Sequence, residues 1–185
     1  KDSIENDLTG SISEYDIQVI KFHGMYLQDD RDRRNERSQK KLERLYSFMV
    51  RLRLPGGDIS ADQWQALHHI AGEYSTGVIK ATTRQTVQLH GIIKSSIKPT
   101  LKAFNKNGLD SIATCGDINR NVAVTSNPAS SIIHTEVYSY AKKISELLMP
   151  VSKAWYEIWI DEEKQELNIE EDNLYQNRFL PRKFK

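Results

Sequence analysis

The order of strand and helix patterns between residues 46 and 112 constrains the fold of this chain more than any other feature. Apolar residues alternate over the first segment, which predicts a strand ended by a Pro-Gly-Gly turn. Ser60, with Gln63 three residues later, forms the capping box of a helix. Two short strands and a second helix follow, and the predicted elements span residues 48–54, 60–74, 78–81, 86–90 and 96–107. This β-α-β-β-α order predicts an α+β fold containing most of a ferredoxin-like split unit.

The remaining segments are predicted to flank this lobe. Residues 1–45 form an N-terminal arm, residues 46–112 the ferredoxin-like lobe, and residues 113–185 the beginning of a second α+β lobe. In the second lobe, Asn127 is expected to cap a helix, and a strand is expected at residues 155–160. The buried stripe of that helix is expected to comprise Ile133, Val137, Tyr140, Ala141, Ile144 and Leu148. The first lobe is expected to bury one cluster, made of Val50, Leu52, Leu54, Trp64, Leu67, Ile70 and Phe104.

Charge and cysteine content exclude several classes of protein. The 26 basic and 25 acidic side chains nearly balance, so the net charge of +1 predicts binding to neither nucleic acid nor membrane. No stretch approaches the ~20 apolar residues of a membrane helix. The single cysteine, Cys115, excludes an internal disulfide and cannot by itself hold a zinc ion or an iron–sulfur cluster, which predicts a reducing, cytoplasmic setting. Without an initiating methionine, the chain is expected to be a piece of a longer protein.

Two polar faces could carry chemistry, and the first includes Arg51 and Arg53. Both lie on the strand face opposite the apolar one, where they form either a solvated edge or one wall of an anion site. The second interpretation requires further cations, for which Arg120, Lys183 and Lys185 are the candidates. The spacing of these residues leaves both interpretations open.

The second polar face lies within residues 80–91. Thr86, Gln88 and His90 alternate with apolar residues, so one face presents donors and acceptors at the regular spacing that a polyanionic ligand requires. An ordinary half-solvated strand has the same pattern, and both interpretations stay open. No nucleophile motif, dinucleotide fingerprint or phosphate loop is present, and no metal site is predicted.

Four motifs in this order resemble a known family. They read KFHGMYLQDDRD at residues 21–32, RLRLPGG at 51–57, TTRQTVQLHG at 82–91 and DINRNV at 117–122. Together they resemble the N-terminal part of the assimilatory sulfite reductase hemoproteins of the nitrite/sulfite reductase family. The resemblance continues through residues 125–128, 141–146 and 180–185, and so covers nearly the whole chain beyond residue 20.

The resemblance implies a full-length enzyme with siroheme and a 4Fe-4S cluster that reduces sulfite to sulfide with six electrons. A flavoprotein reductase subunit or ferredoxin would supply them. In this family the cluster cysteines lie in the C-terminal half, and Cys115 lies outside their motifs. Residues 113–185 would then begin an incomplete siroheme and iron–sulfur domain. Neither cofactor is expected to bind this chain alone, which is expected to be colourless and inactive.

The resemblance also assigns roles to residues. Positions that match the sulfite-binding cations of the family are Arg51, Arg120, Lys183 and Lys185. Positions that match contacts to the eight siroheme carboxylates are Lys80, Thr82, Thr83, Arg84, Gln88, His90 and Arg182. Two of these depart from the usual pattern, since Lys80 stands where Arg is usual and Thr83 where some relatives have Asn. Both replacements keep a donor.

Two alternative functions remain. Nitrite reductases of the same family more often carry Arg-Gln-Asn-Trp-Gln at the turn and lack the histidine, so the turn sequence at residues 84–90 favours sulfite. A non-catalytic module that binds anions or RNA is the other alternative. Nine basic residues between Arg31 and Arg53 would support such a module, but the near-zero net charge and the lack of an aromatic stacking motif argue against it.

Overall fold

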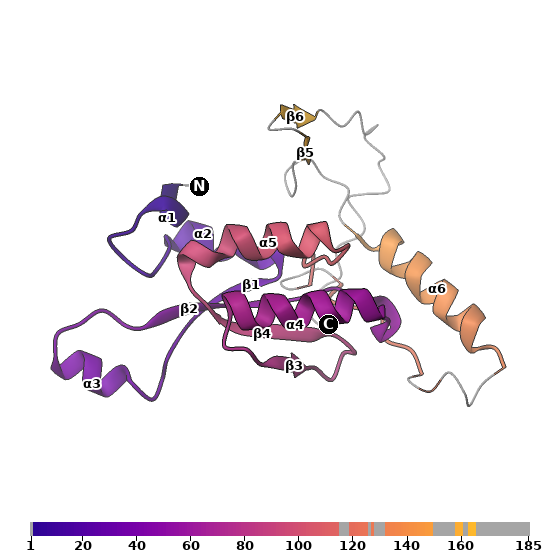
Figure 1. Cartoon of the computed structure of the whole chain (residues 1–185), viewed down its shortest axis with the longest axis horizontal. Coiled ribbons are helices and arrows are strands. Elements are labelled where there is room, and N and C mark those ends of the chain that lie inside the picture. Colours follow the sequence, from indigo (N-terminus) through magenta and orange to yellow (C-terminus); the bar gives the residue numbers. More distant parts are fainter. Residues whose placement is uncertain are drawn as a thin grey trace.

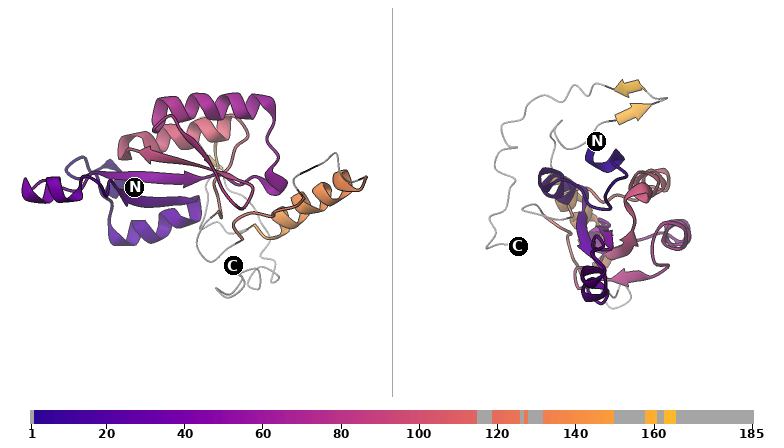
Figure 2. Two further views of the ribbon diagram at one scale, coloured as in Figure 1. Left: turned by 90° about the horizontal axis from the view of Figure 1, so that it is seen from below. Right: turned by 90° about the vertical axis from the view of Figure 1, so that its left-hand side faces the viewer.

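The computed structural model describes residues 2–114, 119–125, 127, 132–149, 158–160 and 163–165. A four-stranded antiparallel sheet lies at the centre, with strand order β1-β2-β4-β3 (Figure 1). Its strands are β1 (Met25–Asp29), β2 (Tyr46–Arg51), β3 (Ile79–Ala81) and β4 (Val87–Ile92). Helices α4 (Ala61–Tyr74) and α5 (Ile97–Lys106) cover one face of this sheet (Figure 2). The α+β class and the β-α-β-β-α order of the ferredoxin-like unit are therefore confirmed.

The edge strand β1 comes from the segment that the sequence analysis places in the N-terminal arm. It pairs antiparallel with β2, from Met25 opposite Val50 to Asp29 opposite Tyr46. In a complete split unit this edge is filled by a strand that follows the second helix. Here a segment from before the unit satisfies the free edge of β2, so the arm contributes a strand to the sheet.

The arm also packs against the helix layer. Short helices α1 (Asp2–Glu5), α2 (Glu14–Val19) and η1 (Ile20–His23) precede β1, and Ile12 and Ile20 belong to the core cluster. The buried ammonium of Lys94, in the turn η3 (Lys94–Ser96), donates hydrogen bonds to the carbonyl oxygens of Ser3, Asn6 and Ser11. These bonds tie the beginning of the chain to the start of α5.

Helix α4 starts where its sequence predicts. The Ser60 hydroxyl accepts from the Gln63 backbone N–H at 3.1 Å, and the Gln63 side chain accepts from the Ser60 N–H at 3.1 Å, which completes the capping box. Leu67, Ile70 and Ala71 are buried against the sheet. Six of the seven residues expected in the core lie in one cluster: Val50, Leu52, Leu54, Leu67, Ile70 and Phe104.

Trp64 is the exception, and its predicted burial is wrong. Its side chain is 47% exposed. Trp64 lies on the same helix stripe as Leu67 and Ile70 but one turn earlier, where the side chains are exposed or half-buried. Periodicity therefore identified the stripe, but it could not show where the covering surface stops.

Helix α6 (His134–Leu147) corrects two further expectations. It begins at His134 instead of following a cap at Asn127, and only Ala141 of its expected apolar stripe is buried. Tyr140 and Ile144 are exposed. The helix lies against the turn η2 (Pro55–Gly57) through a narrow edge, which explains why most of its stripe stays uncovered. Of the strand expected at residues 155–160, β5 (Ile158–Ile160) is described and pairs with β6 (Glu163–Gln165), while the beginning lies outside the described residues.

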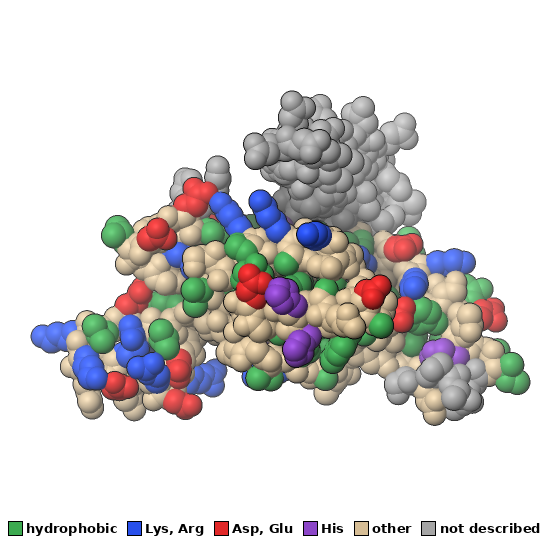
Figure 3. Space-filling model, in the orientation of Figure 1, with side chains coloured by type: hydrophobic (Ala, Val, Ile, Leu, Met, Phe, Trp, Pro, Cys, Tyr) green, Lys and Arg blue, Asp and Glu red, His purple; other side chains and the backbone are tan. Residues whose placement is uncertain are grey.

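The charged excursion between β1 and β2 carries helix α3 (Arg34–Gln39), which buries none of its residues. Basic side chains gather at this end of the molecule in Figure 3. Such a helix is solvated, as its charge pattern predicts. Among the described helices, none has the length and apolar character that a bilayer crossing requires.

Candidate anion and cofactor site

The candidate site is built on the sheet face opposite α4 and α5. Arg51 on β2 pairs with Gln88 on β4, and Gln88 pairs with Lys80 on β3. Directly opposed residues of antiparallel strands point to the same face, so three predicted site residues form one row across the sheet. Val87 and Leu89, which alternate with Gln88, are buried in the core.

A β-bulge places His90 beside this row. Between β2 and β4 the register moves from Val50 opposite Leu89 to Phe48 opposite Ile92, so β4 carries one extra residue there. Gly91 supplies the left-handed conformation, with φ of 76°. His90 Nδ1 lies 3.0 Å from Gln28 Oε1 on β1, and its Nε2 lies 3.1 Å from the Gln88 amide. The bulge therefore aims His90 across β2 toward the edge strand.

Three more predicted residues, Thr82, Thr83 and Arg84, form the turn between β3 and β4. The Thr82 N–H donates to the Thr86 carbonyl at 2.8 Å, which closes the turn. Gln85 adopts a positive φ of 54°, and its side-chain amide pairs with the backbone of Val124. Hydrogen bonds to the segment that follows Arg120 therefore fix the conformation of the turn.

Asn121 fixes that segment in place. Its buried side chain accepts from the Leu54 N–H at 3.1 Å and donates to the carbonyl oxygens of Leu54 and Arg84, each at 2.8 Å. One amide thus joins the end of β2 to the β3–β4 turn. Because Asn121 is so constrained, its neighbour Arg120 is anchored beside these two loops.

The guanidinium of Arg120 has a hydrogen-bond donor without an acceptor among the described residues. Its Nε is buried and has no hydrogen-bond partner among the described residues. No carboxylate in the described part of the chain forms an ion pair with Arg120, Lys80 or Arg84. Buried donors normally have partners, so this group is suited to receive an acceptor from a ligand.

Arg53, by contrast, has a structural role. Its guanidinium donates to Asp110 Oδ2 at 2.9 and 3.1 Å and to Ser145 Oγ at 3.1 Å. These bonds tie the end of β2 to α6. Among the other predicted site residues, Lys183, Lys185 and Arg182 lie outside the described residues.

Sequence reasoning missed three residues that position this site: Gln28, Thr114 and Asn121. Thr114 is fully buried, and its carbonyl accepts from Arg51 Nη1 at 3.0 Å. Gln28 contacts His90, and Asn121 joins two loops. Gln28 and Asn121 lie inside the motifs at residues 21–32 and 117–122, and membership of those motifs could have identified them as site residues. No local pattern marks Thr114.

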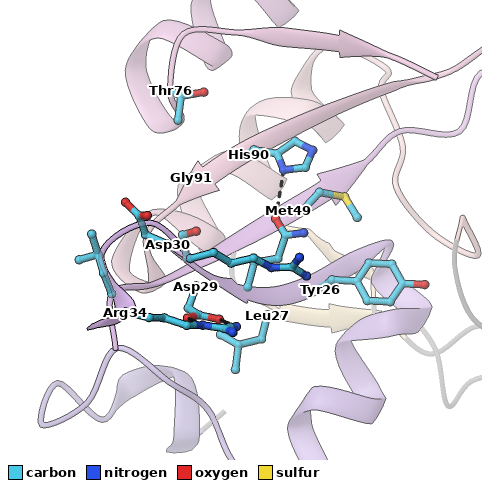
Figure 4. A pocket seen from close by; sticks show the side chains of 13 residues that line it. Tyr26, Leu27, Asp29, Asp30, Arg34, Met49, Thr76, His90 and Gly91 are labelled. Atoms are coloured by element: carbon cyan, nitrogen blue, oxygen red, sulfur yellow. Dashed lines mark hydrogen bonds and ion pairs between the residues drawn. The ribbon is translucent and has the colours of Figure 1, made fainter. Parts of the chain in front are cut away.

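A hollow of about 810 Å³ lies beside His90 at the β1 edge of the sheet (Figure 4). Gln28, Ser47, Met49 and His90 line it, together with Arg31 from the excursion before α3. Figure 4 shows the His90 ring pointing toward the β1 side, with a hydrogen bond drawn from it. Within the described residues, no cluster of three metal-ligating side chains occurs here or elsewhere.

Burial lowers the pKa of both His90 and His23. For His90, the positive charges of Lys80 and Arg51 lower the pKa further, whereas for His23 the carboxylate of Asp110 partly offsets the effect of burial. Both rings are therefore held neutral in the folded chain near neutral pH.

Stability is expected to fall as the pH drops below about 6.5, the ordinary histidine pKa. Below this pH the histidines bind protons in the unfolded state but stay neutral in the folded state. Each such proton makes the free energy of unfolding depend on pH with a slope of about 1.4 kcal/mol per pH unit. Urea unfolding between pH 7.5 and 5.5 measures this slope. His90→Asn should reduce the slope, whereas Gln65→Met, a change without a titratable group on the exposed surface of α4, should not. Equal slopes for the wild type and His90→Asn would contradict the effect.

Comparisons with known proteins bear on the fold of this chain. The family model described as "Nitrite/Sulfite reductase ferredoxin-like half domain" matches residues 40–107. Residues 40–107 form such a half domain. They include α4, α5 and three of the four strands of the sheet, so Arg51, Lys80, Gln88 and His90 lie on a surface of the half domain.

Relatives extend the similarity beyond the half domain. A protein of Leptospira biflexa called "Sulfite reductase [NADPH] hemoprotein beta-component" is 62% identical over the whole chain, and proteins of that name from a Methylobacterium species and Anoxybacillus flavithermus are 53% and 48% identical. The chain spans about a third of their length, 33%, 31% and 33% respectively. Among solved structures, Mycobacterium tuberculosis NirA matches with a TM-score of 0.53 and 27% identity, over 66% of this chain and 24% of NirA.

Proposed function

We propose that this chain is part of a siroheme-dependent sulfite reductase hemoprotein that reduces sulfite to sulfide. The observation that carries the proposal is the row of Arg51, Gln88 and Lys80 on one sheet face, in a chain 62% identical to a protein named for that activity. Sulfite is a small dianion, and clustered cations on a rigid sheet suit its recognition.

The residues of this face fit a polycarboxylate cofactor such as siroheme. Lys80 and Arg84 are cationic, Gln88 offers an amide donor, and the buried Nε of Arg120 lacks a partner among the described residues. In this proposal Lys80, Thr82, Thr83, Arg84, Gln88 and Arg182 hold the siroheme carboxylates, and His90 lies beside them and orients Gln88. When bound, siroheme and a 4Fe-4S cluster would relay electrons from the external donor to the bound anion.

In this proposal, sulfite binds to the cationic side chains that do not hold siroheme. We assign sulfite binding to Arg51 and Arg120, with Lys183 and Lys185 completing the set. Fixed positive charges stabilise the oxyanion character that grows as S–O bonds break, and Lys side chains can also deliver protons. Arg51 suits this role because Gln88 and Thr114 fix its guanidinium in advance.

The electron donor and the reacting anion are also part of the proposal. The relatives are named for NADPH, which favours a flavoprotein reductase subunit over ferredoxin as the donor. The turn at residues 84–90, which ends in His90, favours sulfite over nitrite. Nitrite reduction by the same site is the alternative.

The experiment is to express a full-length protein that contains this chain, verify its siroheme and iron content, and measure reduction of sulfite and nitrite with a reduced viologen. Sulfide should form with six electrons consumed per sulfite, and kcat/KM should be higher for sulfite than for nitrite. The 185-residue chain alone should show no turnover. A higher kcat/KM for nitrite would replace the proposal by its alternative.

A further inference from the structure

The Gln88 amide has only one orientation that suits both of its neighbours. A guanidinium offers donors and no acceptor, so the side of the amide that faces Arg51 must be its oxygen. In that orientation the oxygen accepts from Arg51 Nη2 at 2.6 Å and from Nε at 2.9 Å. The amide nitrogen then faces His90 Nε2 at 3.1 Å and donates to it.

This orientation of Gln88 favours one of the two neutral forms of the His90 ring. Nε2 must accept from Gln88, so the proton of the neutral ring lies on Nδ1. Nδ1 in turn donates to Gln28 Oε1 at 3.0 Å. A continuous chain of hydrogen bonds therefore runs from Gln28 on β1 through His90 and Gln88 on β4 to Arg51 on β2.

We infer that Gln28 is a positioning residue for Arg51: its side-chain oxygen and the Gln88 amide nitrogen together hold His90 in the Nδ1–H form, and that form keeps the Gln88 oxygen turned toward the Arg51 guanidinium. Gln28 touches neither Arg51 nor the row of cations directly, because β2 lies between β1 and β4. The side chain reaches His90 past the small Ser47, which pairs with it on β2. The importance of this arrangement for catalysis rests on the proposed function, but the hydrogen-bond chain does not.

The chain of bonds also excludes a charged His90. A protonated ring would place a second N–H opposite the Gln88 amide nitrogen, and two donors would face each other. Gln88 could accept from His90 only by turning its oxygen away from Arg51. The charged side chains around the ring are Lys80 on β3 and Arg51 on β2, with Asp29, Asp30, Arg31 and Arg34 at the rim of the neighbouring hollow.

The decisive measurement is long-range ¹H–¹⁵N NMR of the 185-residue chain, which distinguishes the two neutral forms of a histidine ring. Wild-type His90 should be in the Nδ1–H form. Gln28→Met, which has similar length and no acceptor, should shift His90 toward the Nε2–H form and change the Arg51 Nε–H resonance. Gln28→Glu, which keeps the acceptor, should retain the Nδ1–H form. Gln65→Met on the exposed surface of α4 is the matched control and should change neither signal.

A second measurement uses the full-length, cofactor-loaded protein. There Gln28→Met should raise KM for sulfite about tenfold, equivalent to about one hydrogen bond, with a smaller effect on kcat, and Gln28→Glu should restore most of the loss. An Nε2–H form in the wild type, or an unchanged ring in Gln28→Met, would overturn the inference whichever anion the enzyme reduces. The expected NMR result in a protein without sulfite turnover would instead leave the positioning of Arg51 intact and refute the proposed function.

Discussion

Replacing Arg120 with glutamine in the full-length protein is expected to lower kcat/KM for sulfite about 10²- to 10³-fold. Loss of one fixed donor to developing oxyanion charge typically raises a barrier by ~3 kcal/mol. The Arg120 Nε is buried and has no hydrogen-bond partner among the described residues, so its capacity to donate is unused there. Steady-state sulfite reduction, measured beside siroheme content and thermal unfolding, tests the expectation.

Arg33→Gln is the matched control, because Arg33 is an exposed cation in the excursion before α3. It should leave turnover and cofactor content unchanged. Wild-type turnover by Arg120→Gln with a full complement of siroheme would refute the assignment of Arg120 to sulfite. Loss of siroheme would assign Arg120 to cofactor binding instead.

Gly24→Ala is expected to destabilise the chain by ~2–4 kcal/mol. Gly24 has φ of 69°, and an added Cβ would lie only 2.4 Å from the backbone oxygen of Ser111 and 2.8 Å from that of Arg51. Overpacking costs ~1–3 kcal/mol and the left-handed conformation about 1 kcal/mol more. The Gly24 carbonyl also accepts from the Arg51 N–H at 2.9 Å, so the clash disrupts the pairing that carries the site.

Gly77→Ala separates the two contributions. Gly77 also has a positive φ, of 78°, but an added Cβ would meet nothing within 4 Å. It should therefore cost only the conformational part, about 1 kcal/mol, in urea unfolding. Equal losses for the two variants would show that close packing around Gly24 does not matter.

The sequence predicted best the elements whose signals are local. Helix α4 has a capping box and an apolar stripe within one segment, and both were found as predicted. The alternation over residues 87–90 likewise separated core residues from the polar face. The prediction for Thr86 is wrong, because Thr86 is buried and its hydroxyl donates to the Leu52 carbonyl. Helix α6 shows the limit of the same reasoning, since its stripe is regular but mostly uncovered. Periodicity reports which residues share a face, and burial depends on what lies opposite.

Strand β1 could not be predicted for a related reason. Its segment gives only a short apolar patch, and it becomes a strand because the free edge of β2 supplies backbone partners. Backbone hydrogen bonds between segments some twenty residues apart do not change the pattern of apolar and polar residues in either segment. The same holds for Trp64, whose exposure depends on how far the surface beneath α4 extends.

The sequence by itself determined the α+β class, the order of elements and the identity of the cations that could bind an anion. Tertiary structure decided which of those cations share a face. Arg51 and Lys80 meet at Gln88 through strand register, and Asn121 anchors Arg120 beside Leu54 and the β3–β4 turn by bonds to backbone more than thirty residues away. Arg53, two residues from Arg51, turns instead to Asp110 and Ser145. The physical reason is that each side chain binds the partners that the folded backbone brings within about 3 Å, and spacing along the chain does not specify those partners.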